Sequence, residues 1–308
     1  MNCGCSVQDA TVSVASCTLR YNGWMRMPLL FLFAILTLFP NQSFACAPTV
    51  TVFPDKVVQG EPVRVTIENV AGKASVRKIL FDGKPVGVFL YQGKPAAFIG
   101  IGLNKRPADY KLVVTLANGN KLEKIIAVGE REKVEAPLGI PEKLGGNTPA
   151  AAKKVISTLA QENLSIYSAR TIPKQLWSGS FHFPISSPVI TDNYGYDRQT
   201  VGYVITHKGT DFRAKEGTPV VAMNRGIVRL GRTYQVYGDT VIIDHGLGLH
   251  TLYMHLSKIK VNEGELVKRG QLVGFSGSTG YAESPHLHVS VWVDKVSIDP
   301  MKFMALFQ

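Results

Sequence analysis

The chain contains very little cysteine: four residues among 308, at positions 3, 5, 17 and 46. Residues 47–308 contain none, so neither a disulfide framework nor a cysteine-rich structural zinc site can form within them. Hydrophobic content of 45% and charged content of 19% are typical of a globular protein rather than a disordered one. The length is sufficient for two domains.

The sequence also lacks a strongly apolar stretch long enough to cross a bilayer, which needs about 20 residues. The apolar run 29–39 is shorter; it follows Arg26 and precedes small residues at Ser43 and Ala45. A basic start, a short apolar centre and small residues before a cleavage point are typical of a secretory signal peptide. We therefore predict a signal peptide at residues 25–45, removed from the mature protein.

Residues 1–24 are polar and do not fit in front of such a signal, so we predict that translation starts at Met25 or Met27. Cleavage would leave Cys46 as the first residue of the mature chain. A cysteine there is similar to the acylation site of bacterial lipoproteins, but the preceding residues 43–44 fit that pattern poorly. We expect a free thiol rather than a lipid anchor.

The chain has no glycine-rich phosphate loop leading into a helix, and no basic strand studded with aromatic residues. Nucleic acid is therefore not an expected partner, although the formal net charge is +11. Residues 1–45 contribute only two arginines and one aspartate, so the remainder carries +10. A basic body of this kind suits an anionic polymer or surface, and a merely basic, solvated surface is the alternative.

Residues 46–130 have the pattern of a β-sandwich, predicted to be immunoglobulin-like. Residues 63–67 alternate apolar and polar side chains, the period of a half-buried strand. Residues 110–116 and 121–128 flank Asn118-Gly119, which predicts a hairpin. This part contains no cluster of titratable residues, so we interpret it as a spacer or docking module.

Residues 131–176 are predicted to form a linker followed by a helix. The linker is polar and contains proline and glycine. Thr148 is a good helix cap, and Pro149 suits the first helical position. The helix would pack against one of the domains through an apolar stripe of Val155, Ile156, Leu159 and Ala160.

Residues 177–308 show short strands and glycine turns, and no helix is expected in this part. The pattern predicts an antiparallel β-sheet domain. The predicted strands are residues 219–223, 226–230, 240–244 and 249–255, followed by a histidine-bearing strand from residue 286.

Several histidines in this part are arranged as metal ligands could be. His286 and His288 are two residues apart in a strand, so their imidazoles share a face about 7 Å apart. His207 and Asp211 form a second cluster, and His255 lies in a third. Two imidazoles and a carboxylate suit zinc, and three protein ligands leave a fourth position for water, as in catalytic sites.

Residues 177–300 resemble the lysostaphin-type, or LytM-like, zinc endopeptidases, which cut peptide bridges in bacterial peptidoglycan. The resemblance rests on His-x-x-x-Asp at 207–211, Tyr-x-His-Leu at 253–256 and His-Leu-His at 286–288. Further matching segments are residues 211–214, 217–220, 243–246, 276–280 and 299–300.

The resemblance implies that His207, Asp211 and His288 bind Zn²⁺, and that His255 and His286 are the catalytic pair. It implies a secreted or periplasmic peptidase whose partners are the stem peptides and cross-bridges of peptidoglycan. The alternatives are a non-catalytic peptidoglycan-binding activator of other hydrolases and a zinc peptidase acting on proteins. Activators of that kind have lost ligands, whereas all five positions are present here.

Two segments depart from the family pattern, and both are expected at the rim of the substrate groove. The residues before His-Leu-His usually read Thr-Gly-Pro, but residues 283–285 read Glu-Ser-Pro. The usual Ser-x-Phe-Gly-x-Arg reads Asp-Asn-Tyr-Gly-Tyr-Asp-Arg at residues 192–198. These departures concern substrate preference rather than metal chemistry.

The remaining histidines are interpreted as structural. His182 lies between two phenylalanines and is expected in a strand. His245 is expected in a turn, and His250 on the strand beside it.

Overall fold

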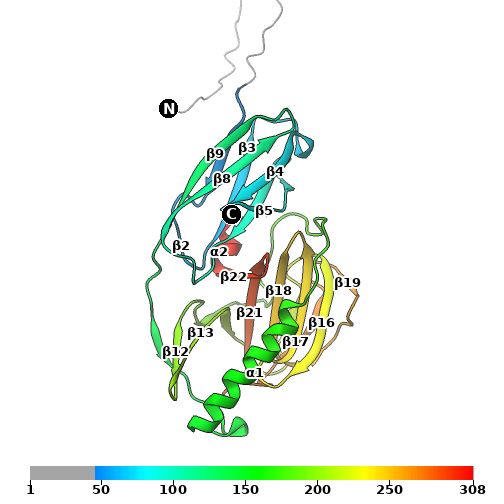
Figure 1. Cartoon of the computed structure of the whole chain (residues 1–308). Helices are drawn as coiled ribbons and strands as arrows, with labels where there is room; N and C mark the ends of the chain where they lie inside the picture. Colours follow the sequence, from blue (N-terminus) through cyan, green and yellow to red (C-terminus); the bar gives the residue numbers. More distant parts are fainter. Residues whose placement is uncertain (1–45, 308) are drawn as a thin grey trace, which may run out of the picture. The chain divides into compact units, whose positions relative to one another are not determined.

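The computed structural model of the chain describes residues 46–307, and the predicted start and signal peptide at residues 1–45 lie outside them. The described part consists mainly of β-strands with few helices, which confirms the predicted all-β class (Figure 1). Among these residues, no helix is both long and apolar enough to cross a membrane.

Two sheets form the first part of the described chain. One contains β1 (Thr49–Phe53), β3 (Pro62–Glu68), β7 (Lys94–Gly100) and β6 (Phe89–Tyr91), in that order. The other contains β2 (Val57–Val58), β9 (Lys121–Gly129), β8 (Ala108–Leu116), β4 (Val76–Phe81) and β5 (Lys84–Val86). β8 and β9 pair antiparallel, as the predicted hairpin requires. A short 3₁₀ turn at Lys73–Ser75 precedes β4.

The two sheets share one hydrophobic core. Alternate residues of a strand point to one face, and Val63 and Val65 of β3 are fully buried. Leu112 and Val114 of β8 lie in the same cluster, so the two sheets face each other. The immunoglobulin-like topology and the domain boundaries stay predictions.

The segment predicted as a linker contains a short strand. β10 (Glu135–Pro137) pairs parallel with β12 (Asp197–Thr200), which pairs with β13 (Tyr203–Thr206). A 3₁₀ turn at Glu142–Leu144 follows. Backbone hydrogen bonds therefore tie this segment to the part of the chain that carries His207.

Helix α1 (Pro149–Tyr167) starts as predicted, with the Thr148 hydroxyl accepting a hydrogen bond from the Ala151 N–H. Its buried face differs from the predicted stripe because Ala160 is exposed. Glu162 and Ile166 are buried instead, and Ile166 packs against residues of β16, β17 and β18. Figure 1 shows α1 beside these strands.

The largest sheet occupies the C-terminal part. Its main path runs β11 (Ile190–Asp192), β14 (Thr210–Arg213), β21 (His286–Val293), β18 (Leu249–Ile259), β17 (Gly238–Gly246), β16 (Gly226–Tyr234) and β19 (Leu266–Val267). β15 (Pro219–Val221) and β20 (Leu272–Ser276) pair with each other, and β22 (Val296–Ile298) pairs with β21. All pairings in this sheet are antiparallel, as predicted.

Three expectations for this part were wrong. A short helix, α2 (Pro300–Ala305), follows the last strand, because the Asp299 carboxylate accepts the Met301 and Lys302 N–H groups and Pro300 suits the first turn. His245 lies inside β17 rather than in a turn, and His182 lies in an extended segment outside any strand.

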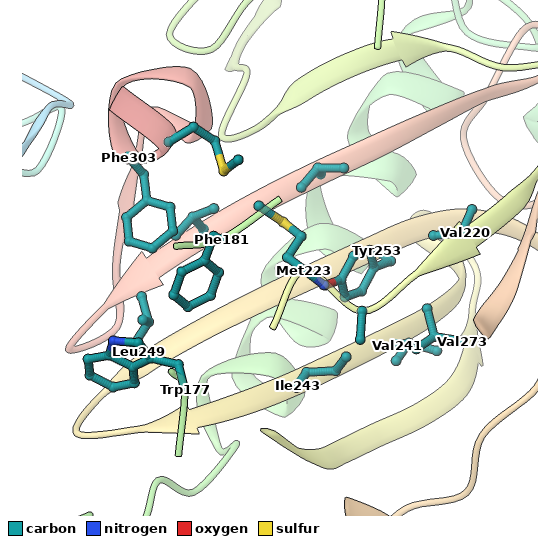
Figure 2. Packing of buried hydrophobic residues seen from close by; sticks show 14 of the residues in the cluster. Trp177, Phe181, Val220, Met223, Val241, Ile243, Leu249, Tyr253, Val273 and Phe303 are labelled. Atoms are coloured by element: carbon teal, nitrogen blue, oxygen red, sulfur yellow. The ribbon is translucent and has the colours of Figure 1, made fainter. Parts of the chain in front are cut away.

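The core of the C-terminal part includes residues of the first sheet. Figure 2 shows Phe181 lying between Trp177 and Phe303 in this cluster. Phe98 of β7 joins it, with its ring centroid 6.0 Å from that of Trp177 and 5.8 Å from that of Phe303. A continuous apolar cluster therefore joins the first sheet to the C-terminal part.

We expect Phe98→Ala to lower the free energy of unfolding by about 3–5 kcal/mol, because it removes a buried ring and leaves a cavity. Leu90→Ala on β6 is the matched control, since Leu90 is 45% exposed. Urea unfolding of both variants measures the difference. Equal midpoints for the two variants would show that Phe98 does not join the two parts into one core.

Candidate metal centre and groove

Two neighbouring strands bring an aspartate and a histidine together. The register of β14 and β21 places Asp211 directly opposite His288. His207 lies four residues before Asp211, and the turn between them passes close to the His288 ring. A Cβ on Gly209 would lie 2.3 Å from His288 Nε2, so the turn requires glycine there.

Three donor atoms from these residues converge. His207 Nε2 lies 3.0 Å from His288 Nδ1 and 3.1 Å from Asp211 Oδ1, and His288 Nδ1 lies 2.7 Å from Asp211 Oδ1. All three residues are buried. Among residues 46–307 this is the one group of three histidine, cysteine or acidic residues with donor atoms close enough to share a metal ion.

The hydrogen-bond partners of the two imidazoles fix which nitrogen is free. His207 Nδ1–H donates to the Asn193 carbonyl at 2.8 Å, which leaves a lone pair on Nε2. The Ser290 hydroxyl donates to the Lys208 carbonyl, so it accepts from His288 Nε2–H at 3.0 Å, which leaves a lone pair on Nδ1. Both free lone pairs face Asp211.

The carboxylate is held in a similar way. Arg198 Nη2 donates to Asp211 Oδ2 at 2.6 Å and also contacts Asp192. Oδ1 is therefore the oxygen left facing the two imidazoles.

This arrangement fits a metal ion. Three acceptor lone pairs facing one another in a buried space repel unless a cation lies among them. Imidazole nitrogen and carboxylate oxygen are zinc ligands, and ligating histidines usually donate their other N–H to an outer partner, as both do here. Burial lowers the pKa of His288 to about 4, so its imidazole is neutral at pH 7, as a ligand must be.

His255 and His286 lie beside the three donors. His255 Nδ1–H donates to the Thr279 carbonyl at 2.9 Å, and His286 Nδ1–H donates to the Ser284 carbonyl at 2.8 Å. Their ring centroids are 4.9 Å apart, and His286 Nε2 is 3.9 Å from Asp211 Oδ1. Each ring therefore keeps Nε2 free for a neighbouring group.

The backbone of His255 adopts a conformation that the sequence did not predict. Its φ of 60° lies in the left-handed region, which costs a non-glycine residue of order 1–3 kcal/mol. Burial, together with the imidazoles of His286 and His288, lowers the pKa of His255 to about 3. The ring is therefore neutral at pH 7, and its Nε2 carries a lone pair.

A groove with a cavity of about 480 Å³ opens over these residues. Pro137, Leu138, Gly139 and Pro141 of the segment before α1 line it, with Tyr281 and residues 282–286 also contributing. Arg198 and Arg213 line it as well. Another cavity, of about 510 Å³, is lined by β4, β5 and β22 residues and by none of the five predicted site residues.

The other histidines have structural partners. His182 Nδ1 bonds the Phe183 carbonyl. His245 bonds the Arg225 carbonyl and the Thr251 hydroxyl, and burial lowers its pKa to about 4. His250 contacts the Gly248 and Arg170 carbonyls. None of the three contributes to the group of donor atoms.

The part of the chain that carries this site is similar to several known proteins. Residues 205–300 match the sequence profile of Peptidase family M23. Over 99 residues the chain is 43% identical to peptidoglycan DD-endopeptidase ShyA of Vibrio cholerae, covering 32% of this chain and 23% of that protein. Lysostaphin of Staphylococcus simulans is 41% identical over 118 residues, covering 36% and 24% respectively. The chain thus spans about a quarter of these curated relatives.

A solved structure extends the comparison beyond the site. A Pseudomonas aeruginosa protein described as peptidase M23 is 30% identical to this chain, with a TM-score of 0.61. The alignment covers 82% of this chain and 96% of that one, so it includes much of the part before residue 177.

We expect Asp211→Ala and His288→Ala to abolish stoichiometric zinc binding, because each removes one of only three convergent donors. Metal analysis of the purified variants, refolded or dialysed with equimolar zinc, measures the loss. His250→Ala is the control, since that imidazole bonds the Gly248 and Arg170 carbonyls, lies near Asp244 and is not one of the convergent donors. One equivalent of zinc retained by both ligand variants would contradict the assignment.

Proposed function

Because the chain belongs to peptidase family M23, we propose that it is a zinc metalloendopeptidase that hydrolyses peptide cross-links in bacterial peptidoglycan. The observation that carries this proposal is the convergence of three acceptor lone pairs beside two imidazoles, next to a groove that Asp211, His255 and His286 line. We propose His207, Asp211 and His288 as the ligands and His255 and His286 as the catalytic pair.

Zinc bound by this set would polarise the scissile carbonyl and lower the pKa of a bound water to about 7. The outer partners of the ligands have a separate task. Asn193, Ser290 and Arg198 hold the three donors in one orientation, so little reorganisation is needed when the ion binds.

The two other imidazoles move and hold protons. The Nδ1–H of His255 is bonded to the Thr279 carbonyl, which leaves Nε2 free to take the proton that an attacking water loses and to pass it to the leaving amine. His286 lines the groove with 18% of its side chain accessible, and its Nε2 lies 3.9 Å from Asp211 Oδ1. Its bond to Ser284 keeps the ring in that orientation.

Two other functions are alternatives, and one experiment distinguishes them from this proposal. A non-catalytic activator of other wall hydrolases would need the groove only for binding, and the presence of all five residues favours the enzyme over it. A peptidase for protein substrates would use the same chemistry on another polymer. Digestion of purified sacculi compared with digestion of casein, followed by mass spectrometry of released muropeptides, distinguishes the three.

We further propose that the protein acts outside the cytoplasm, in the periplasm or cell envelope, after removal of residues 25–45. The signal-like segment supports this location, and the excess of basic residues suits an anionic wall. Cys46 is exposed and free, so acylation of this residue stays an alternative means of attachment.

We expect His255→Ala and His286→Ala to keep one equivalent of zinc but lose turnover by about 10²–10⁴-fold, the usual contribution of general acid–base catalysis. Neither imidazole belongs to the set of three convergent donors. Zinc content and muropeptide release should be measured on the same preparations. A metal-free His286→Ala beside a zinc-loaded His288→Ala would reverse the two roles.

We expect binding to intact sacculi to weaken as salt rises, because the +10 carried by residues 46–308 is screened beyond about 8 Å at physiological ionic strength. Sedimentation of His286→Ala with sacculi separates binding from cleavage. Binding that does not change between low and high salt would mean that the basic surface is not used for the wall.

A further inference from the structure

The buried carboxylate of Glu162 has no part in the metal centre, yet it is one of the few charged side chains in the interior. It lies on α1 and is 8% exposed. Its oxygens accept hydrogen bonds from three consecutive N–H groups, those of Gln235 at 2.6 Å, Val236 at 3.0 Å and Tyr237 at 3.2 Å. These bonds offset the cost of burying the charge and fix the loop between β16 and β17 to the helix.

That loop in turn contacts residues 279–281, which form the segment beside the groove. The Tyr281 N–H donates to the Val236 carbonyl at 2.7 Å. The Asp239 N–H donates to the Thr279 hydroxyl at 2.9 Å. Contact is so close that a Cβ on Gly280 would lie 2.4 Å from the Gly238 nitrogen. Hydrogen bonds and close contact therefore join residues 236–239 to residues 279–281.

His255 is hydrogen-bonded both to the loop and to residues 279–281. Its backbone N–H donates to the Tyr237 carbonyl at 3.1 Å, and its Nδ1–H donates to the Thr279 carbonyl at 2.9 Å. The left-handed backbone of His255 is unfavourable by itself and persists only because its surroundings impose it. The groups that impose it are the ones that Glu162 holds in place.

We propose that Glu162 is a positioning residue for catalysis: through the loop of residues 235–237 it sets the place of the His255 imidazole. This inference rests on the proposed peptidase function. Without the carboxylate, three N–H groups lose their acceptor and the loop can relax, which carries the Tyr237 and Thr279 carbonyls with it. The metal ligands lie on β14, β21 and the turn before β14, outside the loop of residues 235–237, so we expect them to keep their places.

The first test compares Glu162→Ala with Glu162→Gln in the full chain loaded with zinc. Because a misplacement of about 1 Å can cost about 10²-fold, Glu162→Ala should lower kcat by roughly 10- to 100-fold. KM and zinc stoichiometry should stay as in the unmodified protein. Glu162→Gln keeps one acceptor oxygen and should show an intermediate kcat. It also serves as the informative variant if Glu162→Ala does not fold.

Ile166→Ala is the matched control. Ile166 lies on the same helix and is fully buried. Its apolar cluster includes Met254 and the partly buried Tyr237 of the loop, but the Ile166 side chain makes no hydrogen bond. It should lower the melting temperature and leave kcat unchanged at temperatures well below melting. A fall in kcat after Ile166→Ala as large as after Glu162→Ala would assign the effect to helix packing and overturn the proposal.

A second readout does not depend on turnover. Amide hydrogen exchange of His255, measured by NMR on the zinc-loaded protein, should be faster in both Glu162 variants and unchanged in Ile166→Ala. Unchanged exchange at His255 in the Glu162 variants would overturn the proposal. If the unmodified protein releases no muropeptides, the proposed function fails, and the exchange measurement still decides whether Glu162 holds His255.

Discussion

The site depends on three acceptor lone pairs held face to face in a buried position. Such an arrangement is unfavourable unless a cation occupies the space between the lone pairs. In this protein the register of two paired strands produces the arrangement. Asp211 and His288 lie opposite each other on paired strands, and a glycine turn brings His207 to the same point. Each of the three then has an outer partner that fixes the free atom: Asn193, Ser290 and Arg198. The chemistry follows from that orientation.

The parts before residue 177 contribute more than a spacer would. Phe98 shares an apolar cluster with Trp177 and Phe303, so the first sheet stabilises the part that carries the site. Arg131 Nη2 donates to the Tyr194 carbonyl at 2.6 Å, next to the Asn193 carbonyl that holds the His207 ring. The segment before α1 forms one wall of the groove. Support for the centre thus comes from several segments of the chain.

Much of the architecture could be predicted from the sequence because it depends on local patterns. Alternating apolar residues indicate strands, Thr148-Pro149 indicates a helix start, and the histidine spacings indicate that several donors share one region. Asp299-Pro300 is a helix-start signal as well as a family motif, and α2 begins there. His245 precedes a glycine, yet β17 continues through Gly246.

The remaining features could not be predicted, because they depend on contacts between residues far apart in sequence. The φ of His255 is imposed by Tyr237 and Thr279, and nothing in the residues around position 255 indicates it. In the sequence, Glu162 has the character of an exposed helix residue. It is buried only because the loop after β16 bonds to it. The hydrogen bond between Arg198 and Asp211 likewise depends on how their strands lie in the folded chain.

The central claim is that two imidazoles and one carboxylate hold a zinc ion and leave a position for water. X-ray absorption at the zinc edge on the metal-loaded protein tests it most directly. The account predicts nitrogen and oxygen neighbours at about 2.0–2.2 Å, with two imidazoles and no sulfur. In Asp211→Ala the same signal should be lost. A spectrum with four imidazoles, or with sulfur at about 2.3 Å, would contradict the account.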